Sequence, residues 1–141
     1  MTDDIQRLLI FKLRGIRYAL DLHDVAEVLD PPVTHPVPWM PVCFRGAMNF
    51  HGSLTSVLDL ATFMGIGPAE ERGSILVLDR RIANLALWVD EVINIVPCDL
   101  ILEEDVSHDQ LVEKILILAD GELRMLGLPK LLERAEETLT R

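Results

Sequence analysis

Short apolar runs separated by glycine-containing turns recur along the whole chain and favour a β-protein built from small sheets. Residues 6–13 and 16–20 flank an Arg-Gly pair, and residues 115–119 and 123–128 flank an Asp-Gly pair. Two such runs joined by a tight turn predict an antiparallel hairpin. Glycine readily adopts the positive φ that these turns need, so Gly121 is expected to form the turn of the closing hairpin.

The rest of the chain is assigned by the same local rules. Residues 45–60 are expected to form two strands around Gly52. Asp59 then caps a short helix that ends at Gly65. Further strands are predicted at residues 74–79, 82–89 and 92–96.

Other segments carry different patterns. Apolar residues at three- and four-residue spacing predict a short helix within residues 22–29. Residues 31–41 contain five prolines, which cannot donate ladder hydrogen bonds, and predict an extended loop. Residues 98–111 are acidic and are expected to be irregular. A closing helix is predicted with Pro129 at its start.

The predicted elements also occur twice in the same order. Displacing the chain so that Leu9 falls on Leu76 aligns the apolar positions of two successive segments. The repeat predicts two similar small β-barrels in a single domain, residues 1–141. The approximate halves are residues 1–72 and 73–141, with strands allowed to cross between them.

The negative net charge of the chain makes some classes of binding partner unfavourable. The chain has 13 basic and 23 acidic residues, a net charge of −10, and therefore repels nucleic acid and anionic lipid. No apolar run approaches the ~20 residues that cross a bilayer, and the N-terminal segment does not resemble a signal peptide. A cytoplasmic protein without direct membrane insertion is expected.

No reaction centre is evident in the residue pattern. The histidines and cysteines do not form metal-ligand pairs, and no motif for a metal or cofactor is recognised. Cys43 and Cys98 are expected to be free thiols. Two alternatives stay open, a thiol hydrolase that uses Cys43 and a β-barrel that binds a small molecule. A cavity larger than about 300 Å³ would favour the second.

Several motifs, taken in order, resemble the CheW-like domain family. Residues 18–29 read YALDLHDVAEVL, and the proline-rich segment and RGAMNFHGSLTSVLDL at residues 45–60 follow. LALWVDEVINI and the closing ILILADGELRMLGLPKLL are similar to later segments of the family. The resemblance extends over about residues 6–133. Its core signature is matched by Gly46, Asn49, Gly52, Asp59 and Leu60.

The resemblance implies a mainly β fold of two packed five-stranded SH3-like barrels with short helices and a C-terminal helix. It implies a non-catalytic adaptor, without cofactor, that couples the cytoplasmic tip of a chemoreceptor to the regulatory domain of a CheA-type histidine kinase. An adaptor in a motility or developmental kinase pathway is the alternative. The partner-binding positions carried over from the family are Val25, Glu27, Gly46, Ala47, Asn49 and His51.

Some of these positions have structural explanations too. Val25 could equally belong to the core, and Gly46 and Gly52 permit tight backbone turns. Asn49 is expected to satisfy loop backbone groups. Two residues depart from the family pattern, because His51 replaces the usual arginine and Ser56 replaces a common proline. Losing the arginine removes a permanent charge from the predicted contact surface.

Overall fold

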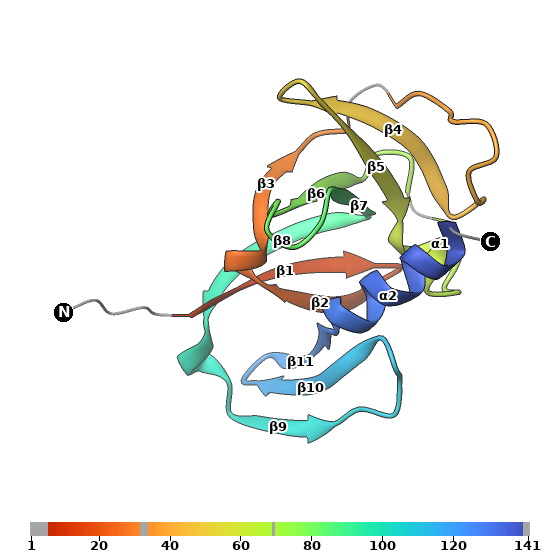
Figure 1. Cartoon of the computed structure of the whole chain (residues 1–141). Coiled ribbons are helices and arrows are strands. Elements are labelled where there is room, and N and C mark those ends of the chain that lie inside the picture. Colours follow the sequence, from red (N-terminus) through yellow and green to blue (C-terminus); the bar gives the residue numbers. More distant parts are fainter. Residues whose placement is uncertain (1–5, 32–33, 69, 140–141) are drawn as a thin grey trace.

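Two β-sheets and a C-terminal helix make up the protein (Figure 1). The computed structural model describes residues 6–31, 34–68 and 70–139. The six-stranded sheet has the order β8-β1-β2-β11-β10-β9, and the five-stranded sheet has the order β3-β6-β7-β5-β4. The first contains β1 (Arg7–Leu13), β2 (Ile16–Asp21), β8 (Glu91–Pro97), β9 (Glu103–Val106), β10 (Val112–Leu118) and β11 (Gly121–Leu126). The second contains β3 (Val25–Leu29), β4 (Phe44–Phe50), β5 (Ser53–Asp59), β6 (Ser74–Leu78) and β7 (Leu85–Val89).

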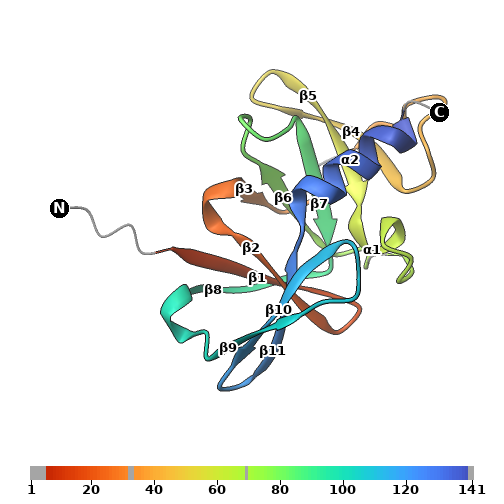
Figure 2. The same cartoon turned by 60° about the horizontal axis from the view of Figure 1, so that its bottom comes forward.

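Helices are short except at the C-terminus. The 3-10 turns η1 (Leu22–Asp24) and η2 (Cys98–Leu100) follow β2 and β8, and α1 (Leu60–Phe63) follows β5. The helix α2 (Leu128–Leu139) leaves β11 and runs toward the five-stranded sheet (Figure 2).

The predicted repeat is confirmed at the level of strand register. In β1 and β2, Leu9 pairs with Leu20, and in β6 and β7 the equivalent Leu76 pairs with Leu87. The order β8-β1-β2-β11-β10 has its counterpart in β3-β6-β7-β5-β4, and β9 is the additional strand. Both sheets also contain one parallel pair at equivalent positions, β2 with β11 and β7 with β5.

The two repeats exchange strands. The hairpin β1–β2 pairs with β8 and β11 from the second repeat, and the hairpin β6–β7 pairs with β3 and β5 from the first. Each sheet therefore contains strands from both predicted halves, and the boundary near residue 72 does not separate the sheets.

The exchange buries both faces of the central strands. In β1, Leu9 and Phe11 enter the large cluster shared by the sheets, whereas Leu8 and Ile10 enter a cluster within the six-stranded sheet. Successive side chains of a strand point to opposite faces, so burial of both faces produces a continuous apolar run. Leu131 of α2 is also fully buried in the shared cluster.

Most of the local predictions are confirmed. The hairpins around Gly15, Gly52 and Gly121 form, and Gly121 has a φ of 132°. Asp59 caps α1, and Pro129 lies in the first turn of α2. The proline-rich segment lies outside named strands where it is described; two of its residues, 32 and 33, lie outside the described residues.

Two local predictions are wrong. The short helix expected within residues 22–29 is only the turn η1, followed by the strand β3. Backbone pairing of β3 with β6 outweighs the helical spacing, and the β-branched Val25 and Val28 suit a strand. The acidic segment expected to be irregular contains β9, which pairs with β10 and gives one sheet six strands in place of the predicted five.

Replacing Asp59 with alanine should lower the free energy of unfolding by at least about 1 kcal/mol. Its buried carboxylate accepts a hydrogen bond from the Thr62 N–H at 3.2 Å and lies 3.5 Å from Arg45 Nε. Asp59→Asn keeps a cap acceptor but removes the charge, so it should lose less stability than Asp59→Ala. Chemical denaturation measures both, and an unchanged midpoint for Asp59→Ala would show that the cap contributes nothing.

Candidate partner-binding surface

The strand β3 forms one edge of the five-stranded sheet and is largely exposed. It pairs with β6 on one side, and Ala26, Glu27 and Val28 are exposed, Val28 to 43%. Such an edge offers both unpaired backbone groups and side chains to a partner.

The strand β8 forms the equivalent edge of the six-stranded sheet. Ile93 and Ile95 on β8 are 37% and 50% exposed. Ile95 pairs with Leu9 in the same way that Val28 pairs with Leu76, so these two exposed residues are related by the repeat. Both edges lie on the side of the molecule that Figure 1 shows at the left. Ile93 and Ile95 were not among the residues predicted from the sequence, although the repeat relates Val28 to Ile95.

A hollow connects the two sheets at the start of β3. It has a volume of about 350 Å³ and is lined by Arg7, Asp21, Leu22, His23 and Val25. Val25 also packs against the large shared core. Its side chain therefore contributes to the core and is also accessible from the hollow, and its role in partner binding stays a prediction.

Two predicted residues come together at the far end of the five-stranded sheet. His51 Nε2 lies 3.6 Å from Glu27 Oε2, and the side chains are 73% and 44% exposed. Glu27 belongs to β3 and His51 follows β4, which are the two opposite edges of this sheet. A contact between side chains on opposite edges requires the sheet to curl, as expected for an SH3-like barrel. The Phe50 ring also contacts the imidazole edge-on, with centroids 4.3 Å apart.

Backbone conformation explains the residues around His51. His51 and Gly52 both have positive φ, 49° and 83°, as the two-residue turn between β4 and β5 requires. Asn49 Oδ1 accepts a hydrogen bond from the Gly52 N–H at 3.0 Å, which confirms its expected role in the loop. Asn49 itself is exposed, so it also remains accessible.

Gly46 and Ala47 are buried and serve the backbone. Ala47 exchanges two backbone hydrogen bonds with His35, at 2.8 and 3.0 Å. Gly46 has a φ of 114°, and a Cβ there would lie 2.3 Å from the His35 carbonyl oxygen. These two predicted partner-binding residues can therefore affect a partner only indirectly, through the backbone conformation that they give to β4.

The loop before β4 presents an apolar tip that was not predicted from the sequence. Trp39 is fully exposed and Val42 is 93% exposed. Trp39 also has a φ of 70°, in a turn where Met40 N–H donates to the Val37 carbonyl. Pro38 is the feature that could have predicted this turn, because proline favours the second position of a turn whose third position needs positive φ.

The structure bears on both alternatives to an adaptor. Cys43 is buried, and burial raises the pKa of its thiol, whereas a nucleophilic cysteine needs a lowered pKa. The hollow at η2 has a volume of about 480 Å³, above the threshold of about 300 Å³ for a ligand site, but charged side chains such as Asp21, Glu104 and Lys114 line it. Within the described part of the chain, no side-chain cluster could hold a metal ion, and no helix is long and apolar enough to cross a membrane.

Comparison with known proteins agrees with this architecture. The family described as CheW-like domain matches residues 7–136. The chain belongs to the CheW-like domain family. Members of this family are adaptor and scaffolding proteins of chemotaxis-type signalling that act through protein–protein contacts and are generally non-catalytic.

Two individual proteins resemble this CheW-like domain. Protein PilI of Pseudomonas aeruginosa is 29% identical over 84 residues, which cover 58% of this chain and 47% of PilI. The chain thus matches about half the length of that curated relative. The crystal structure of the scaffolding protein TtCheW from Thermoanaerobacter tengcongensis has a TM-score of 0.75 at 24% identity. That likeness covers 90% of this chain and 87% of TtCheW and establishes the shared fold.

Replacing Gly46 with alanine should destabilise the CheW-like domain more than replacing Gly52. Both glycines have positive φ, so both substitutions carry the cost of that conformation, roughly 1 kcal/mol. Only the Gly46 side chain would collide with backbone, because nothing lies within 4 Å of a Cβ at Gly52. Chemical denaturation of the two variants measures the difference. Equal losses of unfolding free energy in the two variants would show that the His35 backbone moves away from a Cβ at residue 46 without cost.

Proposed function

We propose that this protein is a non-catalytic cytoplasmic adaptor that couples the tip of a chemoreceptor to the regulatory domain of a CheA-type histidine kinase. Two exposed edges, β3 and β8, lie beside a hollow between the sheets and support this role. Edge strands with accessible apolar side chains are suited to bind another protein, and such binding needs no catalytic residue.

The receptor is proposed to bind at the hollow. Val25 lines it, and the exposed Val28 and Ile95 extend the apolar surface along the two edges. An amphipathic receptor helix can place its apolar face on such a surface, as helices do in other hydrophobic grooves. A rim of Arg7 and Asp21 supplies charges of both signs that can orient the helix.

The kinase is proposed to bind at the end of the five-stranded sheet where Glu27 and His51 pair. Both side chains are exposed, and Asn49 is accessible beside them. A contact at this end leaves the hollow free for the receptor, so one adaptor can hold both partners. That separation is what coupling requires.

A pathway other than chemotaxis is the second candidate. The similarity to Protein PilI supports a CheW-like adaptor in a pathway other than chemotaxis, and we propose a motility or developmental kinase as its partner there. Pull-down with candidate kinases and receptor tips distinguishes the pathways, because each pathway has its own receptor and kinase.

Val25→Asp should abolish receptor binding and leave kinase binding intact, because the new charge would face an apolar helix across the hollow. Binding is measured by pull-down with the receptor tip and with the kinase regulatory domain. Since Val25 also packs on the core, circular dichroism must show that the variant is folded. Unfolding would assign Val25 to the core.

Ile95→Asp tests the same surface without touching that part of the core, because Ile95 is half exposed. It should weaken receptor binding as well. Val106→Asp is the control, since Val106 is 78% exposed on β9 and lies outside the proposed surface. Full receptor binding by folded Val25→Asp and Ile95→Asp proteins would place the receptor elsewhere.

His51 should make partner binding sensitive to pH if it contacts a partner carboxylate. An imidazole becomes charged as the pH falls from about 7.5 to 6, so affinity should rise over that range. His51→Arg should raise the affinity by about 1 kcal/mol and flatten the pH dependence, because a guanidinium is always charged and an exposed ion pair is screened. Titration calorimetry at both pH values measures these changes.

The existing pair with Glu27 requires a control, since it also responds to the charge on His51. In Glu27→Gln the pH dependence should persist if the imidazole meets a carboxylate of the partner. It should disappear if only the internal pair responds. Equal affinities of the parent and His51→Arg at both pH values would make His51 a turn residue with no part in recognition.

A further inference from the structure

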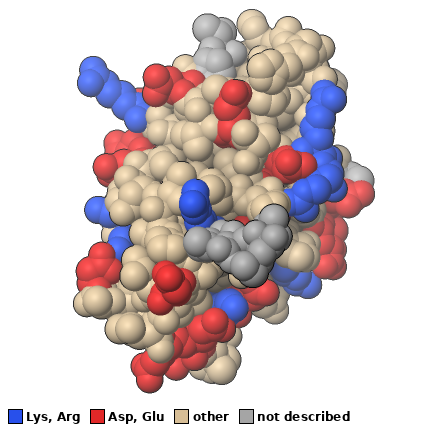
Figure 3. Space-filling model, turned by 90° about the vertical axis from the view of Figure 1, so that its left-hand side faces the viewer, with Lys and Arg blue, Asp and Glu red and all other residues tan. Residues whose placement is uncertain are grey.

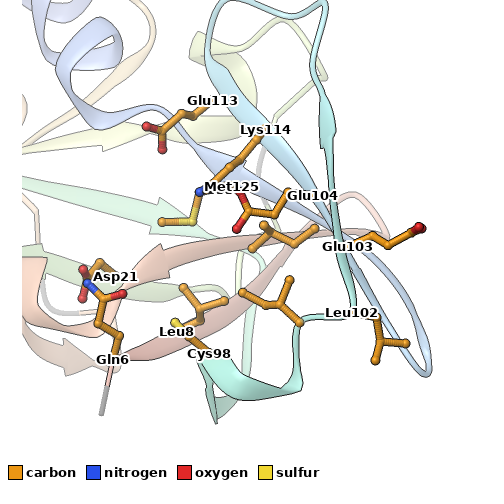
Figure 4. A pocket seen from close by; sticks show the side chains of 12 residues that line it. Gln6, Leu8, Asp21, Cys98, Leu102, Glu103, Glu104, Glu113, Lys114 and Met125 are labelled. Atoms are coloured by element: carbon orange, nitrogen blue, oxygen red, sulfur yellow. Dashed lines mark hydrogen bonds and ion pairs between the residues drawn. The ribbon is translucent and has the colours of Figure 1, made fainter. Parts of the chain in front are cut away.

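A second hollow lies at the opposite end of the molecule from the Glu27–His51 pair, where the six-stranded sheet curls beneath η2 and β9. It has a volume of about 480 Å³ and receives side chains from β1, β2, β10 and β11 as well. We call it the acidic hollow. Leu8 and Cys98 lie at its base in the close view, between Asp21 on one side and Glu104 with Lys114 on the other (Figure 4).

The base of the acidic hollow is apolar. Leu8 and Leu116 are almost fully buried, and Ile101 and Met125 are partly buried beside them in the same apolar cluster. Leu102 at the opening is 66% exposed. A concave apolar site at the mouth of a curled sheet is a common position for a ligand, and an apolar side chain of moderate size would fit its volume.

The wall of the acidic hollow carries excess negative charge. Asp21, Glu104 and Glu113 contribute three carboxylates, against the single ammonium group of Lys114, whereas the Glu103 carboxylate points away from the hollow (Figure 4). Lys114 Nζ is already held by Glu104 Oε1 at 3.0 Å. Acidic side chains also gather at the lower end of the face in Figure 3, the end that carries β9 in Figure 1. The charge favours a basic ligand and disfavours an acidic one.

The edge of the sheet beside the acidic hollow is open to a further strand. Among the described residues β9 pairs with β10 alone, and all four of its residues are exposed. Its side chains include Glu103, Glu104 and Asp105 and no basic residue. Two copies of this edge would repel each other, so a second copy of the chain is a poor partner, whereas a basic strand is attracted.

We infer that the acidic hollow and the free edge of β9 together bind an extended basic peptide segment of a partner protein, with one apolar side chain entering the hollow. Main-chain hydrogen bonds to β9 would supply affinity, and the hollow and its carboxylates would supply specificity. This contact goes beyond the proposed receptor and kinase surfaces. It shares Asp21 with the receptor hollow, but β9, β10 and η2 belong to it alone, so it can fail without affecting the other two surfaces.

The test uses the full chain and a fluorescent peptide that alternates lysine and valine. Fluorescence anisotropy at low salt should show binding. Peptides that replace each lysine with glutamate, or each valine with serine, should bind at least about tenfold more weakly. Glu104→Gln combined with Glu113→Gln should weaken the lysine–valine peptide by about tenfold, since it removes two carboxylates and releases Lys114.

A matched variant separates a site from general attraction to an acidic protein. Glu133→Gln combined with Glu136→Gln makes the same change in net charge on exposed positions of α2. It should alter the affinity by less than about twofold. The inference is overturned if the two double variants bind equally, or if the lysine–valine peptide does not bind at all.

Cys98 reports where the peptide binds. Its thiol lines the hollow and is partly accessible, whereas Cys43 is buried and acts as an internal reference. Bound peptide should slow alkylation of Cys98 by iodoacetamide severalfold, as measured by mass spectrometry, and leave Cys43 unchanged. Binding without protection of Cys98 would place the peptide elsewhere and refute the assignment.

Discussion

An exchange of hairpins holds the two repeats together and creates their common core. β1 and β2 complete the sheet of the second repeat, and β6 and β7 complete the sheet of the first. If either hairpin were removed, the sheet it joins would lose its central strands and the shared core would lose one wall. We infer from this that residues 1–141 fold as one domain, although the chain contains two repeats. Both faces of β1 and β6 are buried as a result. One face of each strand packs in the large cluster that the two sheets share, and the other face packs in a smaller cluster within its own sheet.

The same exchange determines which surfaces remain for partners. The third strand of each repeat, β3 or β8, covers the outer side of an incoming hairpin and becomes an edge. Val28 and Ile95 are therefore exposed for the same topological reason, and the edges β3 and β8 that carry them lie on the same side of the molecule (Figure 1). An adaptor built this way can present two related edges without any catalytic group, since the surface is a product of how the sheets are assembled.

Local chemistry could be predicted from the sequence because it depends on neighbouring residues. The turn at Gly121, the cap made by Asp59 and the loop role of Asn49 all involve contacts within a few positions. The family motif then supplied the fold, and the repeat indicated two related sheets. The partner-binding roles stay predictions, because burial and exposure alone do not identify a partner.

Long-range pairing could not be predicted in the same way. Apolar residues within residues 22–29 do recur at helical spacing. The strand β3 forms instead because its backbone pairs with β6, about fifty residues further along the chain, as between Val25 and Leu78. The burial of Gly46 also depends on a distant contact, the approach of the His35 backbone. The pairing of Glu27 with His51 requires the sheet to curl until its two edges meet, and nothing in the sequence around either residue specifies that. These features come from tertiary packing, which overrides local preference.

The connections that precede β4 and β10 distinguish the repeats. His35 pairs with Ala47 on β4, and Glu104 pairs with Leu116 on β10, so the two contacts occupy equivalent positions. In the first repeat the connection is rich in proline, which lacks the N–H for a ladder, and its described residues form an isolated bridge with β4. In the second repeat no proline interrupts residues 103–106, and the bridge grows into the strand β9. The repeats thus share their exchanged hairpins and differ at the covering segment, where one presents an apolar loop and the other an acidic edge. Selectivity for different partners can therefore evolve in these two segments without disturbing the exchange that holds the sheets together.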